Sequence, residues 1–136
     1  MIQRIQSLFL ALAALTFLGT GFFRSAIAVE ESLAWLPMTL LGLNAVVSFG
    51  AIIAIFSFKN RKKQLQLTNL LQYLAILALV AAFGAMYLSG GINEITSNVG
   101  VMALIALPVL GYVFVRLANG RIKKDIELVR SMDRLR

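Results

Sequence analysis

The sequence contains no cysteine and no histidine among its 136 residues. Without cysteine it has no disulfide bond and no thiolate ligand for a metal. Without histidine it lacks the commonest zinc and copper ligand, the usual axial ligand of haem and the side chain that titrates near neutral pH. Most side chains that support metal, acid–base or nucleophilic catalysis are therefore missing. We expect a protein that is not an enzyme, with no catalytic residue, no metal and no cofactor.

Charge is also scarce, since only 14% of the residues are charged and 60% are apolar. The mean hydropathy is +0.85. Soluble domains have about 25% charged and roughly 45–50% apolar residues. A soluble fold of this length could not bury so much apolar surface, whereas a bilayer removes the need to bury it. The composition therefore predicts one all-α domain embedded in a membrane.

Four apolar runs predict four transmembrane helices, because about 20 helical residues span a hydrocarbon layer of roughly 30 Å. Asn119-Gly120, after the last run, is typical of a helix stop. Residues 1–120 would form the transmembrane domain, and residues 121–136 a cytoplasmic tail. The predicted helices cover about 5–27, 36–58, 68–89 and 99–118.

The first run has a second interpretation, as a secretory signal. Arg4 precedes it, and Ala26-Ile27-Ala28 follows it as a small-residue cleavage motif. The run is longer than the apolar core of a usual signal peptide. We therefore expect it to be retained as the first transmembrane helix.

The cations predict the orientation of the chain. If the amino terminus is cytoplasmic, Arg24 is the one cation on the outer side of the membrane, together with Glu30, Glu31 and Glu94. We interpret these three acids as ordinary solvated loop charges. An excess of cations in short loops marks the cytoplasmic side of a membrane protein. The short loops then predict two antiparallel hairpins with both termini cytoplasmic. This topology explains the net charge of +7 without nucleic acid. The inside cations are Arg4, Lys59, Arg61, Lys62, Lys63, Arg116, Arg121, Lys123, Lys124, Arg130, Arg134 and Arg136.

The predicted spans carry no ionisable residue at mid-depth, where such residues are usually functional. Asn44 and Ser48 share one helix face, and we interpret them as interhelical hydrogen-bonding groups. Gly50 is one of several small residues at four-residue spacing, which allow helices to approach closely. Pro108 predicts a kink in the fourth helix.

The tail predicts a short basic amphipathic helix, because Ile122, Ile126, Val129 and Met132 recur at helical spacing. It could lie on the anionic inner leaflet, dock on a cytoplasmic partner, or continue the fourth helix. The cations that we expect to contact the membrane surface or a partner are Lys59, Arg61, Lys62, Lys63, Arg121, Lys123, Lys124, Arg130 and Arg134.

Three polar segments carry a resemblance to a known family. The segments 1–8, 59–62 and 122–136 resemble those of a family of small Bacteroidota membrane proteins, the domain-of-unknown-function family 4293. The likeness spans the full length. It implies four helices and an inner-membrane location, and it implies no activity, catalytic residue or cofactor.

Our leading hypothesis is a non-catalytic, multi-pass protein of the bacterial inner membrane. It would be an accessory or scaffolding subunit that joins partner membrane subunits through its helices and its basic tail. The alternative is a small pore, a holin-like protein or a carrier for an uncharged or hydrophobic solute, with Asn44, Ser48 and Pro108 beside the path.

Overall fold

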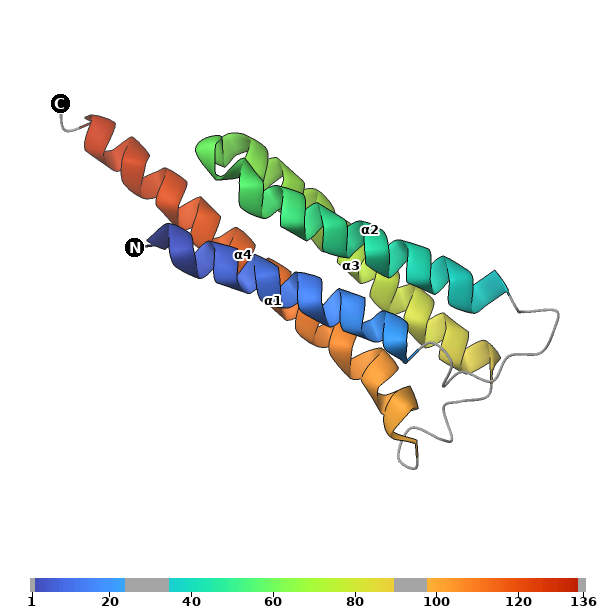
Figure 1. Cartoon of the computed structure of the whole chain (residues 1–136). Helices are drawn as coiled ribbons and strands as arrows, with labels where there is room; N and C mark the ends of the chain where they lie inside the picture. Colours follow the sequence, from blue (N-terminus) through green and yellow to red (C-terminus); the bar gives the residue numbers. More distant parts are fainter. Residues whose placement is uncertain (1, 24–34, 90–97, 135–136) are drawn as a thin grey trace.

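The computed structural model describes residues 2–23, 35–89 and 98–134, with side chains for 5–23, 35–89 and 98–132. All regular structure in these residues is helical (Figure 1). The helices, each long and apolar enough to cross a membrane, confirm the predicted all-α class. They are α1 (Ile2–Phe22), α2 (Trp35–Phe56), α3 (Arg61–Leu88) and α4 (Val99–Arg134), with a short 3-10 turn, η3 (Ser57–Lys59), after α2.

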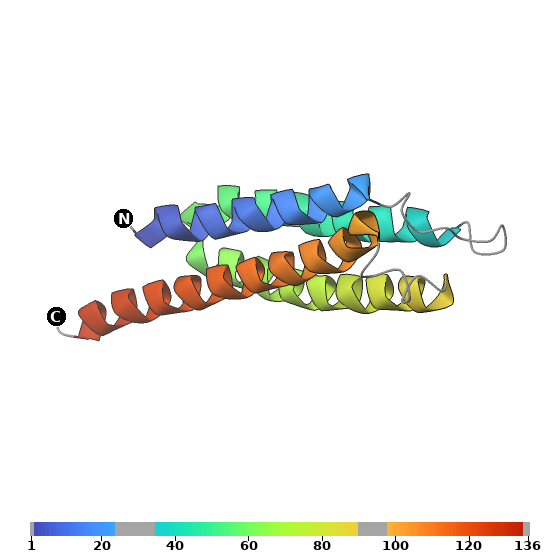
Figure 2. The same cartoon turned by 90° about the horizontal axis from the view of Figure 1, so that it is seen from below.

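The helices form an elongated bundle in which each packs mainly against two others. α1 contacts α2 and α4, and α3 also contacts α2 and α4. The start of α1, the η3 turn and the last turns of α4 lie at one end of the bundle (Figures 1 and 2). We call this the basic end, because it carries Lys59, Lys62, Lys63 and Arg130.

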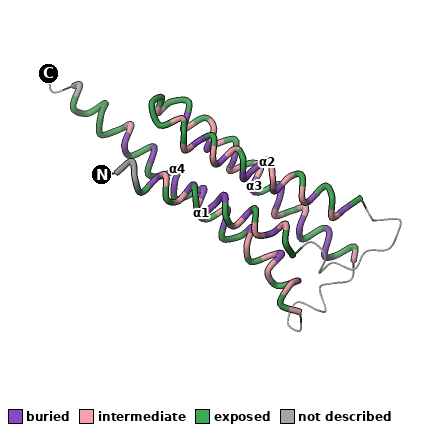
Figure 3. The backbone as a smooth tube through the Cα atoms, viewed as in Figure 1, coloured by how far each residue is buried: buried purple, intermediate pink, exposed green. Residues whose placement is uncertain are grey.

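The residues coloured as buried lie at intervals along each helix (Figure 3). Large residues such as Leu10, Phe17 and Val47 alternate with many alanines. The alanines at four-residue spacing lie at the contacts, and Ala78 and Ala82 are both buried. Small side chains here let the helices approach closely, as the sequence predicted.

The outer surface of the helices is apolar. Only 33% of each membrane-length segment is buried inside the bundle. Large apolar side chains such as Leu15, Phe49, Val80 and Leu110 are exposed on all four helices. This surface would be costly in water, at about 25 cal/mol for each Å² of apolar area. It is the arrangement expected of helices that face lipid.

The contact between α1 and α4 at Gly111 requires a residue without a side chain. A Cβ placed on Gly111 would lie 2.6 Å from Phe17 Cε2 and 2.8 Å from Thr16 Oγ1. Phe17 is fully buried and cannot move outward. Gly111 therefore sets the distance between these helices, which the sequence analysis did not identify.

α1 runs from Ile2 to Phe22 instead of the expected 5–27. The two largest differences from the expected helix bounds are at the start of α3 and the end of α4. α3 begins at Arg61 rather than near residue 68. The reason is local: the Asn60 side chain caps the helix by accepting the Lys63 backbone N–H at 3.2 Å. The basic stretch therefore forms the first turns of α3.

α4 is the second difference, because it runs through Asn119-Gly120 without a break and continues to Arg134. The predicted stop at this dipeptide is wrong, and no separate C-terminal helix forms in the described residues. Beyond the dipeptide, Ile122 and Asp125 are buried. Such tertiary packing outweighs the weak local preference for ending the helix.

Several predictions fall on residues or side chains that the structure leaves undescribed. Arg24, Glu30, Glu31 and Glu94 lie outside the described residues, as do Arg136 and the motif 26–28. The side chains of Arg4 and Arg134 are not described either.

Candidate functional site

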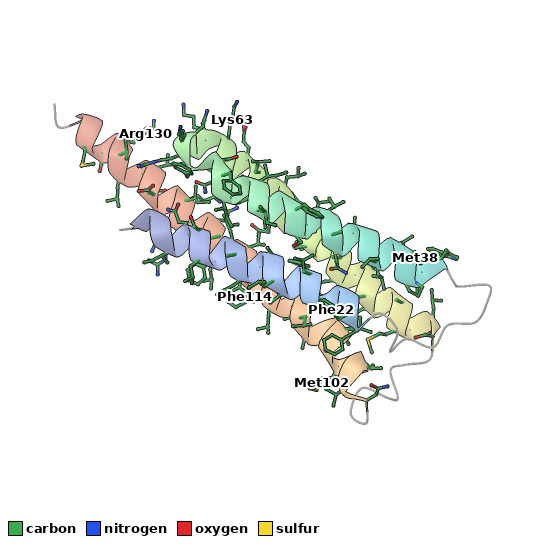
Figure 4. The ribbon with its side chains drawn as sticks, in the orientation of Figure 1. Phe22, Met38, Lys63, Met102, Phe114 and Arg130 are labelled. Atoms are coloured by element: carbon green, nitrogen blue, oxygen red, sulfur yellow. The ribbon has the colours of Figure 1, made fainter. Side chains whose placement is uncertain are left out.

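The predicted cations of the central stretch lie where η3 ends and α3 begins. Lys59 ends η3, and Lys62 and Lys63 stand in the first turn of α3. All three side chains are exposed, whereas Arg61 is partly buried. Figure 4 shows Lys63 and Arg130 projecting at the same end of the molecule, one from α3 and one from α4. The basic end therefore combines cations from separate parts of the sequence.

Arg61 is distinguished from its neighbours by an ion pair with Asp125 of α4. Arg61 Nη1 lies 3.1 Å from Asp125 Oδ2, and the two side chains are 35% and 13% exposed. The contact is one of charge, because this buried Nη1 makes no aligned hydrogen bond. It is the one ion pair among the described residues, and it joins the start of α3 to the last third of α4.

Sequence reasoning missed Asp125, although a signal was present. Asp125 lies three residues after Ile122 and four before Val129, so it shares the stripe predicted to be apolar. A carboxylate on such a stripe needs a buried partner, because an unpaired buried charge is very costly. Arg61 supplies that partner.

About two turns deeper in the bundle, polar side chains connect α4 to α3. Asn119 donates from Nδ2 to Asn69 Oδ1 at 2.6 Å and lies 3.5 Å from Gln72 Oε1. Asn119 is 3% exposed, so its amide lies between the helices. This contact occupies the side chain that the sequence analysis interpreted as part of a helix stop.

A further polar contact joins α3 to α2. Gln64 donates from Nε2 to the Ala54 carbonyl at 3.0 Å. Thr68 is fully buried and bonds to the backbone of its own helix. On α1, Gln6 is buried as well, and its Nε2 makes no hydrogen bond within the described residues. The basic end thus has a polar interior as well as a charged surface.

The residues predicted to shape helix packing lie in the middle of the bundle. Ser48 donates to the Ala14 carbonyl at 2.9 Å and so joins α2 to α1. Asn44 Nδ2 donates to Leu40 within α2, and Asn44 Oδ1 is buried without a partner in the described part of the chain. A Cβ on Gly50 would lie 2.5 Å from Leu71 Cδ2. Pro108 is buried inside α4, which remains helical on both sides of it.

The tail cations do not form one cluster. Arg121, Lys123, Lys124 and Arg130 are all exposed and point in different directions around α4. Two surface grooves divide this region. The first is lined by Lys62, Ile126, Val129 and Arg130, and we call it the α3–α4 groove. The second is lined by Lys124, Glu127, Leu128 and Ser131.

The chemistry of the basic end is that of charge attraction, hydrogen bonding and apolar contact. Among the described residues, no group of three acidic, histidine or cysteine side chains could hold a metal ion. The cations available for an anionic group are Lys59, Lys62, Lys63 and the four exposed cations of α4 just described. These cations give the basic end a positively charged surface.

The comparisons with known proteins agree with the resemblance seen in the polar segments. No curated protein and no solved structure matches the chain. The profile of one family, described as Domain of unknown function (DUF4293), matches residues 2–135. That match covers almost the whole sequence, including all four helices and the basic extension of α4. The chain therefore belongs to the DUF4293 family.

Proposed function

We propose that this protein is a non-catalytic, multi-pass protein of the bacterial inner membrane that serves as an accessory or scaffolding subunit of a larger membrane complex. Its four helices would cross the bilayer as two antiparallel hairpins, with the basic end in the cytoplasm. The C-terminal part of α4 would stand on the cytoplasmic side. The observation that carries the proposal is this long helical extension, which has exposed apolar residues beyond a membrane-length segment.

The membrane placement is supported by the apolar outer surface on all four helices. α1 and α2, with 21 and 22 residues, are each about 32 Å long, which matches the hydrocarbon layer. α4 has 36 residues and a length of about 54 Å. At least 20 Å of α4 therefore extends past the hydrocarbon. All charged residues of α4 lie between Arg116 and Arg134.

The cytoplasmic location of the basic end is supported by the positive-inside rule. Lys59, Lys62 and Lys63 flank the η3 turn, and α4 brings further cations to the same end. Positive residues in short loops are retained on the cytoplasmic side during insertion.

A protein partner is supported by the outer face of the α4 extension. Leu128 is 51% exposed and Met132 is 62% exposed. Lys124 and Glu127 lie beside Leu128, so this face mixes both signs of charge with apolar groups. Protein interfaces have this character, whereas a helix that only seeks anionic lipid has a purely basic polar face. We infer that a second membrane subunit packs here.

The absence of catalysis is supported by composition, because the whole sequence has neither histidine nor cysteine.

The alternative, a small pore, holin-like protein or solute carrier, has one observation in its favour. Asn44 Oδ1 is a buried acceptor without a partner in the described residues, and it could accept a hydrogen bond from a solute. It has less support, because Ser48 on the same face is bonded to Ala14.

Topology can be tested cleanly, because the chain has no natural cysteine. Lys63→Cys and Glu94→Cys should label on opposite sides of the membrane. In intact cells, a membrane-impermeant maleimide should label only Glu94→Cys. Labelling of Lys63→Cys should require permeabilisation. Equal labelling of both in intact cells would refute the hairpin topology.

The accessory role can be tested by gentle extraction and native mass measurement. The chain should leave the membrane with other membrane subunits. Leu128→Ser with Met132→Ser should release them, and Lys123→Gln, an exposed change on another face of α4, should not. A lone chain in several mild detergents would contradict the proposal.

A further inference from the structure

The α3–α4 groove has a specific composition that the proposed function does not use. Its four lining residues come from two helices, Lys62 from α3 and the other three from α4. Lys62 and Arg130 are exposed, and Ile126 is half-buried. The groove therefore presents one cation from each helix above an aliphatic surface.

The two cations of the groove lack an acidic partner in the described residues. Asp125, which precedes Ile126, is engaged with Arg61. Glu127, three residues before Arg130, lines the other groove, and it forms no ion pair among the described residues. The described side chains therefore place one unpaired cation from each helix at the α3–α4 groove. The Arg61–Asp125 contact also holds the two walls of the groove together.

The groove lies where the membrane surface is expected. Phe56 and Phe58, at the end of α2 and in η3, are 74% and 48% exposed. These apolar rings indicate that lipid reaches the η3 turn. Lys62 is four residues after Phe58, in the first turn of α3. A layer of polar headgroups about 5–7 Å thick would begin at this level.

From these observations we infer that the α3–α4 groove is a binding site for one anionic phospholipid of the cytoplasmic leaflet. The phosphate would lie between Lys62 and Arg130, and the glycerol and first acyl carbons would contact Ile126 and Val129. Basic pockets between transmembrane helices bind anionic headgroups in this way. The inference rests on the proposed membrane placement of the basic end, and it does not require a protein partner.

A zwitterionic lipid would bind less well, because its own ammonium group is repelled by the two cations. A free phosphate would gain the charge contacts but not the aliphatic contact. The site should therefore prefer phosphatidylglycerol to phosphatidylcholine, and inorganic phosphate should not displace the bound lipid.

The test is native mass spectrometry of the full-length protein in detergent with either phosphatidylglycerol or phosphatidylcholine. Lys62→Gln with Arg130→Gln should lower phosphatidylglycerol binding by about tenfold or more, since each nearby cation contributes roughly a factor of five to ten. The matched control is Arg121→Gln with Lys124→Gln, which removes the same charge from other faces of α4. It should change binding less than twofold. Circular dichroism of both variants should show that the helices remain intact.

Equal losses in the two variants would overturn the site, because diffuse attraction would then explain the binding. No preference for phosphatidylglycerol, or displacement by inorganic phosphate, would also overturn it. A co-purifying protein released only by the groove variant, with lipid binding unchanged, would assign the groove to a protein instead. The cysteine-labelling test is independent. If labelling supports the topology and lipid binding fails, only this inference is lost.

Discussion

Gly111 and Gly120 lie on the same helix and should respond in opposite directions to the same substitution. A Cβ on Gly111 would enter the space of Phe17 and Thr16, with its shortest contact at 2.6 Å. A Cβ on Gly120 would meet nothing within 4 Å. We therefore predict that Gly111→Ala destabilises the bundle and that Gly120→Ala does not.

The magnitude follows from two opposing effects. Overpacking a filled core costs about 1–3 kcal/mol. Replacing glycine with alanine inside a helix gains up to roughly 1 kcal/mol. Gly111→Ala should therefore lower the free energy of unfolding by about 1–2 kcal/mol, and Gly120→Ala should raise it slightly. Because both substitutions alter helix propensity in the same way, the difference between them measures the contact with α1.

The assay is reversible unfolding by sodium dodecyl sulfate in mild detergent micelles. Dyes on Leu8→Cys of α1 and Leu117→Cys of α4, both exposed positions, would report the separation of the two helices. Circular dichroism would show whether helical content persists. Equal shifts for Gly111→Ala and Gly120→Ala would refute the packing of Gly111 against Phe17 and Thr16.

Three further predictions concern polar groups of the bundle, and each is checked by the same unfolding measurement. Asn44→Leu should leave stability unchanged or increased, because it removes a buried acceptor that has no partner in the described residues; a large loss would mean that Oδ1 is bonded. Asn119→Ala should cost about 0.6–1.7 kcal/mol, with a coupling to Asn69 in a double-mutant cycle; additive effects would contradict the 2.6 Å hydrogen bond. Arg61→Asp and Asp125→Arg should each lower the free energy of unfolding by about 1 kcal/mol or more, and the double exchange should restore part of that stability. No restoration in the double exchange would contradict a stabilising ion pair.

The apolar runs were enough to predict the four helices, because a membrane span is defined by length and hydropathy. The ends of α3 and α4 were not predictable in this way. Asn60 and Asn119 are the same residue type with similar local preferences, yet one caps a helix and the other bonds to Asn69 across two helices. The role of Asn119 depends on α3, which places Asn69 beside it. The sequence pattern carries no information on this placement.

The basic surface was predicted as a set of similar cations, and the structure divides that set. Arg61 is engaged with Asp125, whereas Lys62 and Arg130 share a groove. Charge counting treats all of these residues alike, because it has no information on which helix faces which. Asp125 was missed for the same reason, since its partner is 64 residues away in the sequence.

The continuity of α4 favours one of the three arrangements considered for the tail, a continuation of the fourth helix. A tail that lies flat on the leaflet needs a break between the spanning segment and the amphipathic segment, because the two would run in nearly perpendicular directions. α4 has no break from Val99 to Arg134, and the Arg61–Asp125 pair fixes its extension against α3. The extension therefore stands as a continuation of the span. Its side toward α3 is available to a lipid headgroup, and the side with Leu128 is available to a protein. Lipid and protein contacts would then act on different residues of one rigid helix, so their substitutions should separate the two effects.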